Sequence, residues 1–291
     1  MPAKGIKPAG EIVPPCHWGI MSRFQRSTIV RILQVSWPPL TVVAFAVLLW
    51  ALLVRSTGLP SFILPSPADV LAAMGATGDL LLSATASTLA STMVGLGIAI
   101  LLGTAVAALV DLIPFLRRSI YPLLVASQTV QILAIAPLLV IWLGFGRAPT
   151  VVIVVLFTFF PMTIATADGL AATDPDQMAL LKSMGATRSQ LFARVRLPGA
   201  LPSFFSGLRL SVTYSVVAAT IGEWVGGSDG LGLYMLRSKN ALKTDQVFVG
   251  MLITTAISIG LFSLVWIVER AALPWRRSSR GTEEWQESGI Y

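Results

Sequence analysis

Residues with the type and spacing that catalysis requires are scarce in this chain. The sequence holds no phosphate-binding loop ending in Gly-Lys-Ser/Thr and no His-Glu-x-x-His zinc motif. Its single cysteine, Cys16, stands next to its single histidine, His17, and two adjacent ligands cannot complete a metal site. We therefore expect neither an enzyme nor a metal protein, and no cofactor bound by this chain.

The remaining candidates are polar residues inside apolar segments. Gln128 and Gln131 lie about two turns before Pro137, in a segment that is otherwise mostly apolar from residue 120 to 142. Because proline frees a backbone carbonyl and can kink a helix, amides and a kink on one span are typical of a face that lines a water-filled path. Hydrogen bonding of the two glutamines to a neighbouring helix is the alternative.

A second polar group lies near the end of a later apolar segment. Glu223 and Trp224 belong to a glycine-rich stretch, residues 222–232, which we expect to leave regular helix. Irregular backbone at membrane depth is buried or lines a cavity, so Glu223 and Trp224 are candidates for the outer gate of a pore. Trp224 offers a face on which a flat ring could stack. A surface loop is the alternative interpretation.

These residues belong to a chain that is too apolar for a soluble domain. It has 291 residues, of which 55% are hydrophobic and 12% charged, and the hydrophobic residues come in long runs. The sequence therefore predicts an all-α polytopic membrane protein with six transmembrane helices. The expected spans are residues 37–54, 84–110, 120–142, 150–170, 203–222 and 247–268.

Basic residues predict the orientation of these spans. With the N-terminus inside, fifteen Lys and Arg residues flank the spans on the inner side and five on the outer side, as the positive-inside rule requires. The net charge of +7 comes from these short flanks, which argues against nucleic-acid binding. The predicted parts are an N-terminal tail, a first span with an outer segment, a membrane core and a C-terminal tail, at residues 1–36, 37–82, 83–270 and 271–291.

The second expected span carries a small residue at every fourth position. Such a stripe lets another helix approach closely, and we favour packing inside one subunit over a subunit interface. The small residues are Ser87, Ser91, Gly95, Ala99, Gly103 and Ala107.

The longest polar stretch, residues 174–202, lies on the inner side and is built to be ordered. Asp174 is placed to cap a helix, with Gln177 in the return position of a capping box, and Gly185 suits the end of that helix. A loop that merely joins two membrane helices is the alternative. The paired signals favour an ordered surface element.

A second short helix follows in the same stretch. Thr187 and Gln190 predict another capping box, and Pro198 is expected to end the helix. Apolar residues recur at helical spacing on both helices, which is typical of a docking surface. They are Met178, Leu181, Met184, Leu191, Phe192 and Val195.

This stretch resembles the cytoplasmic signature of bacterial binding-protein-dependent ABC importer permeases. Gly185 matches the signature glycine, and Val195-Arg196-Leu197-Pro198 follows at the required distance. The sequence departs from the pattern at Ala179-Leu180-Leu181, where the family has Glu-Ala-Ala, so any contact made by that glutamate is absent or replaced. The resemblance extends from about residue 60 to residue 270.

The resemblance implies the transmembrane fold of a type I ABC importer in the lipid of a bacterial inner membrane, with both termini cytoplasmic. It also implies three partners: a second permease subunit, expected to form a homodimer, a cytoplasmic ATPase dimer that binds ATP, and an extracytoplasmic substrate-binding protein. The ATPase-coupling residues are then expected to be Leu181, Met184, Gly185, Ala186, Leu191, Leu197 and Pro198.

The stretches around Pro137 and around Glu223 look most like the branch that imports nitrate, taurine, alkanesulfonates, riboflavin or hydroxymethylpyrimidine-type thiamine precursors. Residues 222–232 favour the pyrimidine and flavin members, so we expect a vitamin-type heteroaromatic solute. The same machinery importing nitrate, taurine or alkanesulfonates is the alternative. A secondary transporter is disfavoured, because Asp168, Glu223 and Glu269 lie toward the ends of spans and not at the midplane.

Overall fold

The computed structural model describes residues 26–129 and 131–274, and all regular structure in them is helical. Cys16, His17 and most of the two predicted tails lie outside the described residues. The elements are α1 (Arg26–Thr57), α2 (Pro67–Ala76), α3 (Gly78–Leu112), α4 (Pro114–Ser127), α5 (Ile132–Leu143), α6 (Arg147–Ala171), α7 (Pro175–Ser183), α8 (Arg188–Leu191), the π-helix η1 (Phe192–Arg196), α9 (Leu197–Gly226), α10 (Leu231–Asn240) and α11 (Thr244–Ala272).

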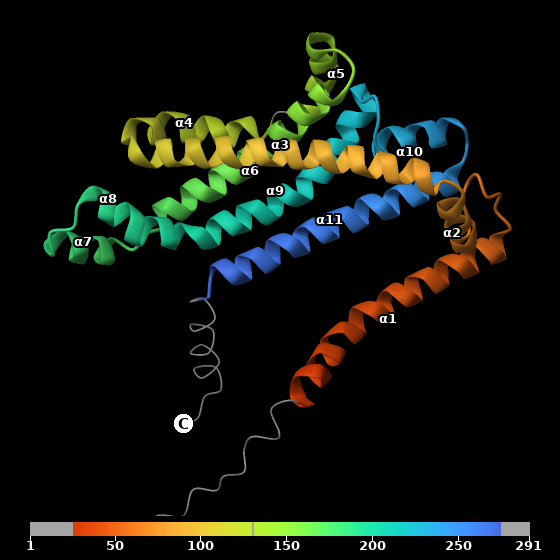
Figure 1. Ribbon diagram of the computed structural model, residues 1–291, viewed down its shortest axis with the longest axis horizontal. Helices are drawn as coiled ribbons and strands as arrows, with labels where there is room; N and C mark the ends of the chain where they lie inside the picture. Colours follow the sequence, from red (N-terminus) through yellow and green to blue (C-terminus); the bar gives the residue numbers. More distant parts are fainter. Residues whose placement is uncertain (1–25, 130, 275–291) are drawn as a thin grey trace, which may run out of the picture. The chain divides into compact units, whose positions relative to one another are not determined.

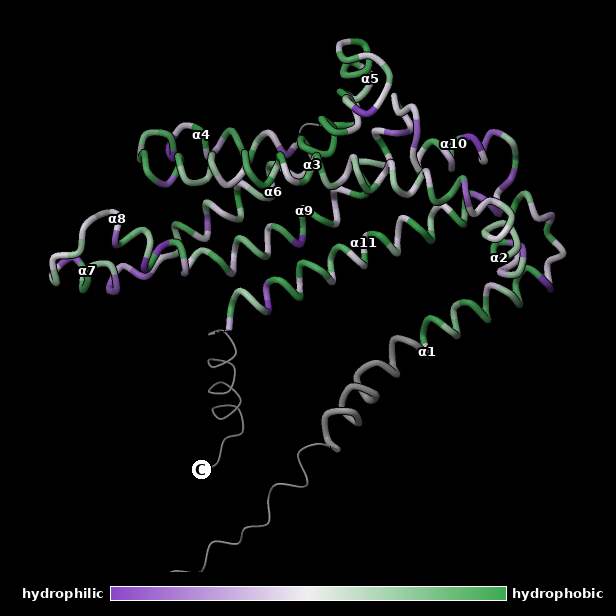
Figure 2. The backbone as a smooth tube through the Cα atoms, in the orientation of Figure 1, coloured by the Kyte–Doolittle hydropathy of each residue, from purple (hydrophilic) through white to green (hydrophobic). Residues whose placement is uncertain are grey.

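The helices from α2 onward form one unit, and α1 belongs to a separate one. In the larger unit α6 packs on both α3 and α9, and α11 packs on α9 (Figure 1). The short helices α7 and α8 lie at one end of the long helices, and α2 and α10 lie at the other end. Figure 2 shows that hydrophobic residues follow the long helices while hydrophilic residues collect at these two ends.

Four helical stretches in the described residues are long and apolar enough to cross a membrane. They are α3, α6, α11 and the continuous stretch from Ser189 to Gly226 that contains α9. The bent pair of α4 and α5 raises the number to five if it forms one span, and α1 contains a shorter apolar helix, Thr41–Thr57. The prediction of an all-helical, multi-pass membrane protein is confirmed, whereas six spans stay a prediction.

Small residues bring α3 and α6 close together. All six residues of the predicted stripe on α3 are buried. A Cβ atom added at Gly95 would lie 2.6 Å from Val154 Cβ, and one added at Gly103 would lie 3.1 Å from Thr163 Oγ1. Only small residues allow this approach of two helices in lipid. The stripe therefore packs inside the subunit, as we favoured.

The third predicted span is broken where the sequence predicts only a kink. The segments Phe115–Ser127 and Ile132–Leu143 meet at 93°, while Pro137 lies inside α5. The hydroxyl groups of Ser127 and Thr129 each donate to a backbone carbonyl of the last turn of α4, which competes with helix continuation. Pro137 lies inside α5, and the helix continues past it to Leu143. The prediction placed the disruption too late in the chain.

Candidate functional site

The polar stretch after α6 is an ordered pair of short helices. Asp174 Oδ1 accepts a hydrogen bond of 2.9 Å from the amide of Asp176, so the predicted cap of α7 is confirmed. No return bond from Gln177 occurs among the described residues, so this cap is not a full box. Gly185 has φ +82° and ends the helix as predicted. A side chain at residue 185 would meet nothing within 4 Å, so only the backbone conformation requires glycine there.

The second capping box is complete. The amide of Thr187 donates to Gln190 Oε1 at 2.9 Å, and the amide of Gln190 donates to Thr187 Oγ1 at 3.3 Å. The helix does not stop at Pro198, as we expected, but continues through η1 into α9. The wide turn of a π-helix changes the bonding pattern just before the proline, which avoids the usual conflict with the preceding turn. The second short helix is therefore continuous with a membrane span.

The predicted ATPase-coupling residues differ in exposure. Met184 is 73% exposed and Leu197 is also exposed, whereas Leu181, Ala186 and Pro198 are half-buried. Leu191 is only 4% exposed and packs within this chain. We call the exposed apolar side chains of Leu180 and Met184, at the end of α7, the inner apolar surface, after the side on which the basic residues predict it to lie. It is available for contact with another protein, while Leu191 is not.

An ion pair joins this region to α3. Arg196 Nη1, on the π-helix, lies 2.6 Å from Asp111 Oδ2 near the end of α3. The Asp111 side chain is 5% exposed and the Arg196 side chain 33% exposed. A carboxylate this deeply buried requires its partner, because an unpaired charge in a low-dielectric site is costly. The pair therefore links η1, and with it the start of α9, to the end of α3.

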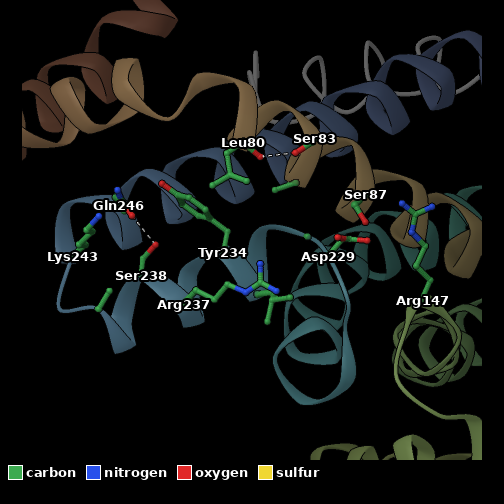
Figure 3. Close-up of a pocket in the computed structure, with 14 residues that line it drawn as sticks. Leu80, Ser83, Ser87, Arg147, Asp229, Tyr234, Arg237, Ser238, Lys243 and Gln246 are labelled. Atoms are coloured by element: carbon green, nitrogen blue, oxygen red, sulfur yellow. Dashed lines mark hydrogen bonds between the residues drawn. The ribbon is translucent and has the colours of Figure 1, made fainter.

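A pocket of about 480 Å³ lies at the opposite end of the unit, between α3, α10 and the start of α6 (Figure 3). Three cationic side chains, Arg147, Arg237 and Lys243, and the carboxylate of Asp229 line it. None of these four forms a salt bridge within the described residues. The pocket therefore carries net positive charge that no ion pair among the described residues neutralises.

Glu223 lies beside this pocket but does not line it. The residue is 2% exposed, and its Oε2 accepts a hydrogen bond of 2.7 Å from the amide of Gly232 in the first turn of α10. The neighbouring amide, that of Leu231, donates to Thr88 Oγ1 at 2.8 Å. A carboxylate and a hydroxyl from α9 and α3 thus satisfy amides at the start of α10, where helices favour negative charge. We call these two bonds the α10 clasp.

The α10 clasp explains why residue 230 is a glycine. A Cβ added at Gly230, which has φ +117°, would collide with the Glu223 carboxyl group. Trp224 is 49% exposed and points away from the clasp by its position in the helix. Both residues are helical, since α9 continues to Gly226 and only residues 227–230 are irregular, so the prediction ended this helix too early. Glu223 therefore stabilises the α10 connection in this structure.

The pore candidates Gln128 and Gln131 are brought together at the break between α4 and α5. They line a pocket of about 450 Å³ with Phe157 and Phe160 of α6 and Tyr214 of α9. Pro137 does not line this pocket. We call it the break pocket. It lies apart from the residues of the α10 clasp, so the five predicted gate residues do not form one site.

Sequence reasoning missed the partners that complete these sites. The aromatic residues of the break pocket stand in apolar runs and give no polar signal, and Thr88 is 143 residues from Leu231. For the ion pair with Arg196, the signal in the sequence was Asp111, an acidic residue directly after the predicted span 84–110. The described residues contain no group of three His, Cys, Asp or Glu side chains that could hold a metal ion.

Comparison with known proteins decides the family. Residues 99–277 match the family described as the inner membrane component of binding-protein-dependent transport systems. The chain belongs to this family. The permease is 37% identical over 230 residues to the formylaminopyrimidine transport permease protein ThiX of Halalkalibacterium halodurans, covering 79% of this chain and 92% of that one. It is 31% identical over 255 residues to the riboflavin transport system permease protein RibX of Chloroflexus aurantiacus, covering 86% and 95%.

The fold comparison agrees with this assignment. A chain of the MetNI methionine ABC transporter, solved in inward-facing conformations, matches with a TM-score of 0.54 at 19% identity, over 65% of this permease and 96% of that chain. At this identity the likeness shows the fold alone. The type I ABC importer fold that the resemblance implied is thereby confirmed, and the protein is a multi-pass membrane component of a transport system.

Proposed function

We propose that this permease forms the translocation path of an ATP-driven importer for a small vitamin-type heteroaromatic solute. Two copies pair in the membrane, a cytoplasmic ATPase dimer supplies the energy, and a substrate-binding protein delivers the solute from outside. ATP is bound and hydrolysed by the separate ATPase subunit. Residues in this chain transmit the motion and line the path.

The inner apolar surface carries this proposal. Met184 and Leu180 expose large apolar side chains on a capped, ordered helix pair, and Gly185 holds the turn between the helices. Exposed apolar residues on an ordered element are typical of a contact with another protein. The stretch continues through η1 into a membrane span, so a partner seated on it can move that span directly.

The charge distribution supports the orientation. Fifteen of the basic residues flank the predicted spans on the side of the inner apolar surface, and by the positive-inside rule this distribution supports cytoplasmic termini. The positively charged pocket drawn in Figure 3, with Arg147, Arg237 and Lys243, would in this orientation lie toward the outer side. Acidic side chains of the substrate-binding protein are the groups that this charge would attract.

The solute class is supported by two relatives. ThiX is named for transport of a formylaminopyrimidine and RibX for transport of riboflavin, and both compounds are flat heteroaromatic molecules. Import of nitrate, taurine or alkanesulfonates by the same machinery is the alternative. More distant relatives, such as the taurine permease protein TauC of Escherichia coli at 29% identity, represent it.

The inner apolar surface is tested by binding of the purified ATPase to membrane vesicles that contain this permease. We expect the ATPase to bind inside-out vesicles and to ignore right-side-out vesicles. Met184→Glu should weaken this binding about tenfold or more, because the contact would bury an unpaired carboxylate. Gly185→Asp should leave insertion intact and separate ATP hydrolysis from uptake, because residue 185 needs φ +82°.

The matched control is Leu242→Glu, which alters a residue that is 68% exposed at the opposite end of the unit. It should leave ATPase binding unchanged. Equal binding by the wild type and Met184→Glu would remove the docking role, and binding to right-side-out vesicles would reverse the proposed orientation. Wild-type coupling in Gly185→Asp would show that the turn is not part of the transmission.

A further inference from the structure

The break pocket contains polar side chains that form no hydrogen bond among the described residues. The side chain of Gln131 caps no amide of α5 although it occupies the N-cap position. Within the described residues, the Gln128 amide and the Tyr214 hydroxyl likewise take part in no hydrogen bond. Tyr214 lies in α9, and the two glutamines flank the break in a helix pair that is apolar enough to enter a membrane. Polar groups in such a segment need water, a partner or a ligand, because lipid offers none.

The rest of the lining is apolar and uncharged, and it combines two phenyl rings with aliphatic side chains. Phe157 and Phe160 project into the same pocket from α6, and Phe160 is held edge-on against Phe159 with ring centroids 5.2 Å apart. No Asp, Glu, Lys or Arg contributes to the lining. An anionic solute would therefore enter without a countercharge, at the cost of burying an unpaired charge. The lining disfavours sulfonates and nitrate and favours a neutral molecule.

Amides, a hydroxyl and phenyl rings together recognise a specific chemistry. A glutamine amide both donates and accepts hydrogen bonds, so Gln128 and Gln131 can pair with ring nitrogens, amino groups or carbonyl groups on the edge of a ring. Phenyl rings prefer offset-stacked or edge-to-face contact with a second aromatic ring. A volume of about 450 Å³ falls in the range of small-molecule sites.

We propose that the break pocket is a solute-binding station for a neutral, flat, nitrogen-containing ring, with Gln128 and Gln131 on the edge of the ring and Phe157 and Phe160 against its face. This inference rests on the proposed function and adds to it a site of selection within the membrane permease itself. The break between α4 and α5 places the Gln128 and Gln131 amides at the same pocket.

The test uses vesicles that contain the permease, its ATPase and its substrate-binding protein, with formylaminopyrimidine as the labelled probe. The double variant Gln128→Leu/Gln131→Leu should lower uptake roughly 10- to 100-fold, as expected for the loss of two hydrogen bonds. Phe160→Leu should lower it several-fold. Gln131→Asn keeps an amide and should retain more uptake than Gln131→Leu. Phe115→Leu, which changes an exposed aromatic residue outside the pocket, is the matched control.

The outcomes separate the two proposals. If wild-type vesicles take up neither formylaminopyrimidine nor riboflavin, the solute class proposed above is wrong, and the proposed binding station is wrong as well. If the wild type carries the probe and the double variant matches it, only the station is wrong. ATPase binding checks that each variant assembles. Rapid disulfide cross-linking between two copies through a cysteine at Gln131 would show that a second permease fills the pocket, which also overturns the station.

Discussion

The two ends of α9 are held by different kinds of contact. At its last turns, Glu223 is almost fully buried and binds a backbone amide of α10, and glycine at residue 230 leaves room for the carboxyl group. Just before its first turn, Arg196 is one-third exposed and pairs with the side chain of Asp111. The first contact joins side chain to backbone in a closed space. The second joins two side chains at the edge of the unit.

These two contacts differ in how far they allow each end of α9 to move. A buried bond to a backbone amide is lost as a whole when α10 shifts, so this end either keeps its geometry or loses it. A partly exposed arginine has a long side chain that can follow its partner over several positions. The Arg196 end is also the end that carries the inner apolar surface. We therefore expect the Glu223 end to set stability and the Arg196 end to set coupling.

The largest effect is expected at the α10 clasp. Glu223→Ala removes the acceptor of the Gly232 amide and leaves a cavity, which should lower the free energy of unfolding by about 3 kcal/mol. Glu223→Gln keeps an acceptor of similar size and should cost about 1 kcal/mol. Thermal unfolding of the permease purified in detergent measures both. Trp224→Ala, at an exposed neighbouring position, is the control. Equal unfolding temperatures for Glu223→Ala and the control would contradict a stabilising clasp.

A smaller and asymmetric effect is expected at the Asp111–Arg196 pair. Arg196→Ala leaves a carboxylate that is 5% exposed without its partner, which we expect to cost about 2 kcal/mol, less than for a fully buried pair. Asp111→Ala leaves an arginine that can reach water, and should cost less than about 1 kcal/mol. Both variants should raise the number of ATP molecules hydrolysed per solute imported.

Exchange of the two residues separates coupling from stability at this pair. Asp111→Arg combined with Arg196→Asp restores an ion pair and should recover part of the coupling, although it places the arginine at the more buried position. The ratio of ATP hydrolysis to uptake, measured beside the unfolding temperature, reports both quantities. Symmetric losses in the two single variants, with unchanged coupling, would mean that the Arg196 end is a static contact like the Glu223 end.

Local signals in the sequence predicted local structure well. The caps at Asp174 and Thr187 and the turn at Gly185 depend on residues within a few positions of one another, so their spacing was sufficient. The role of Glu223 depends on Gly232 and on Thr88 in another helix, and only the fold brings these together. Pro198 misled for a related reason, because a π-helix accommodated it. The resemblance to the family signature, and not local spacing, predicted the type I ABC importer fold.

The smallest effect, which sharpens the comparison, belongs to a second carboxylate at a helix start near the Glu223 end. Asp69 completes a capping box with Ser66 at the start of α2 but is exposed. Its hydrogen bonds with Ser66, first from the side chain and then from the backbone, hold the pKa of Asp69 below its usual value of 3.8. The ionised form therefore stabilises α2 fully above about pH 4, and this contribution is lost as the pH falls through the lowered pKa.

Asp69→Asn should speed hydrogen exchange in the first turn of α2 only roughly two- to fivefold at neutral pH, and the difference from the wild type should vanish at acidic pH. A loss as large as that of Glu223→Ala would show that burial is not what distinguishes the two carboxylates.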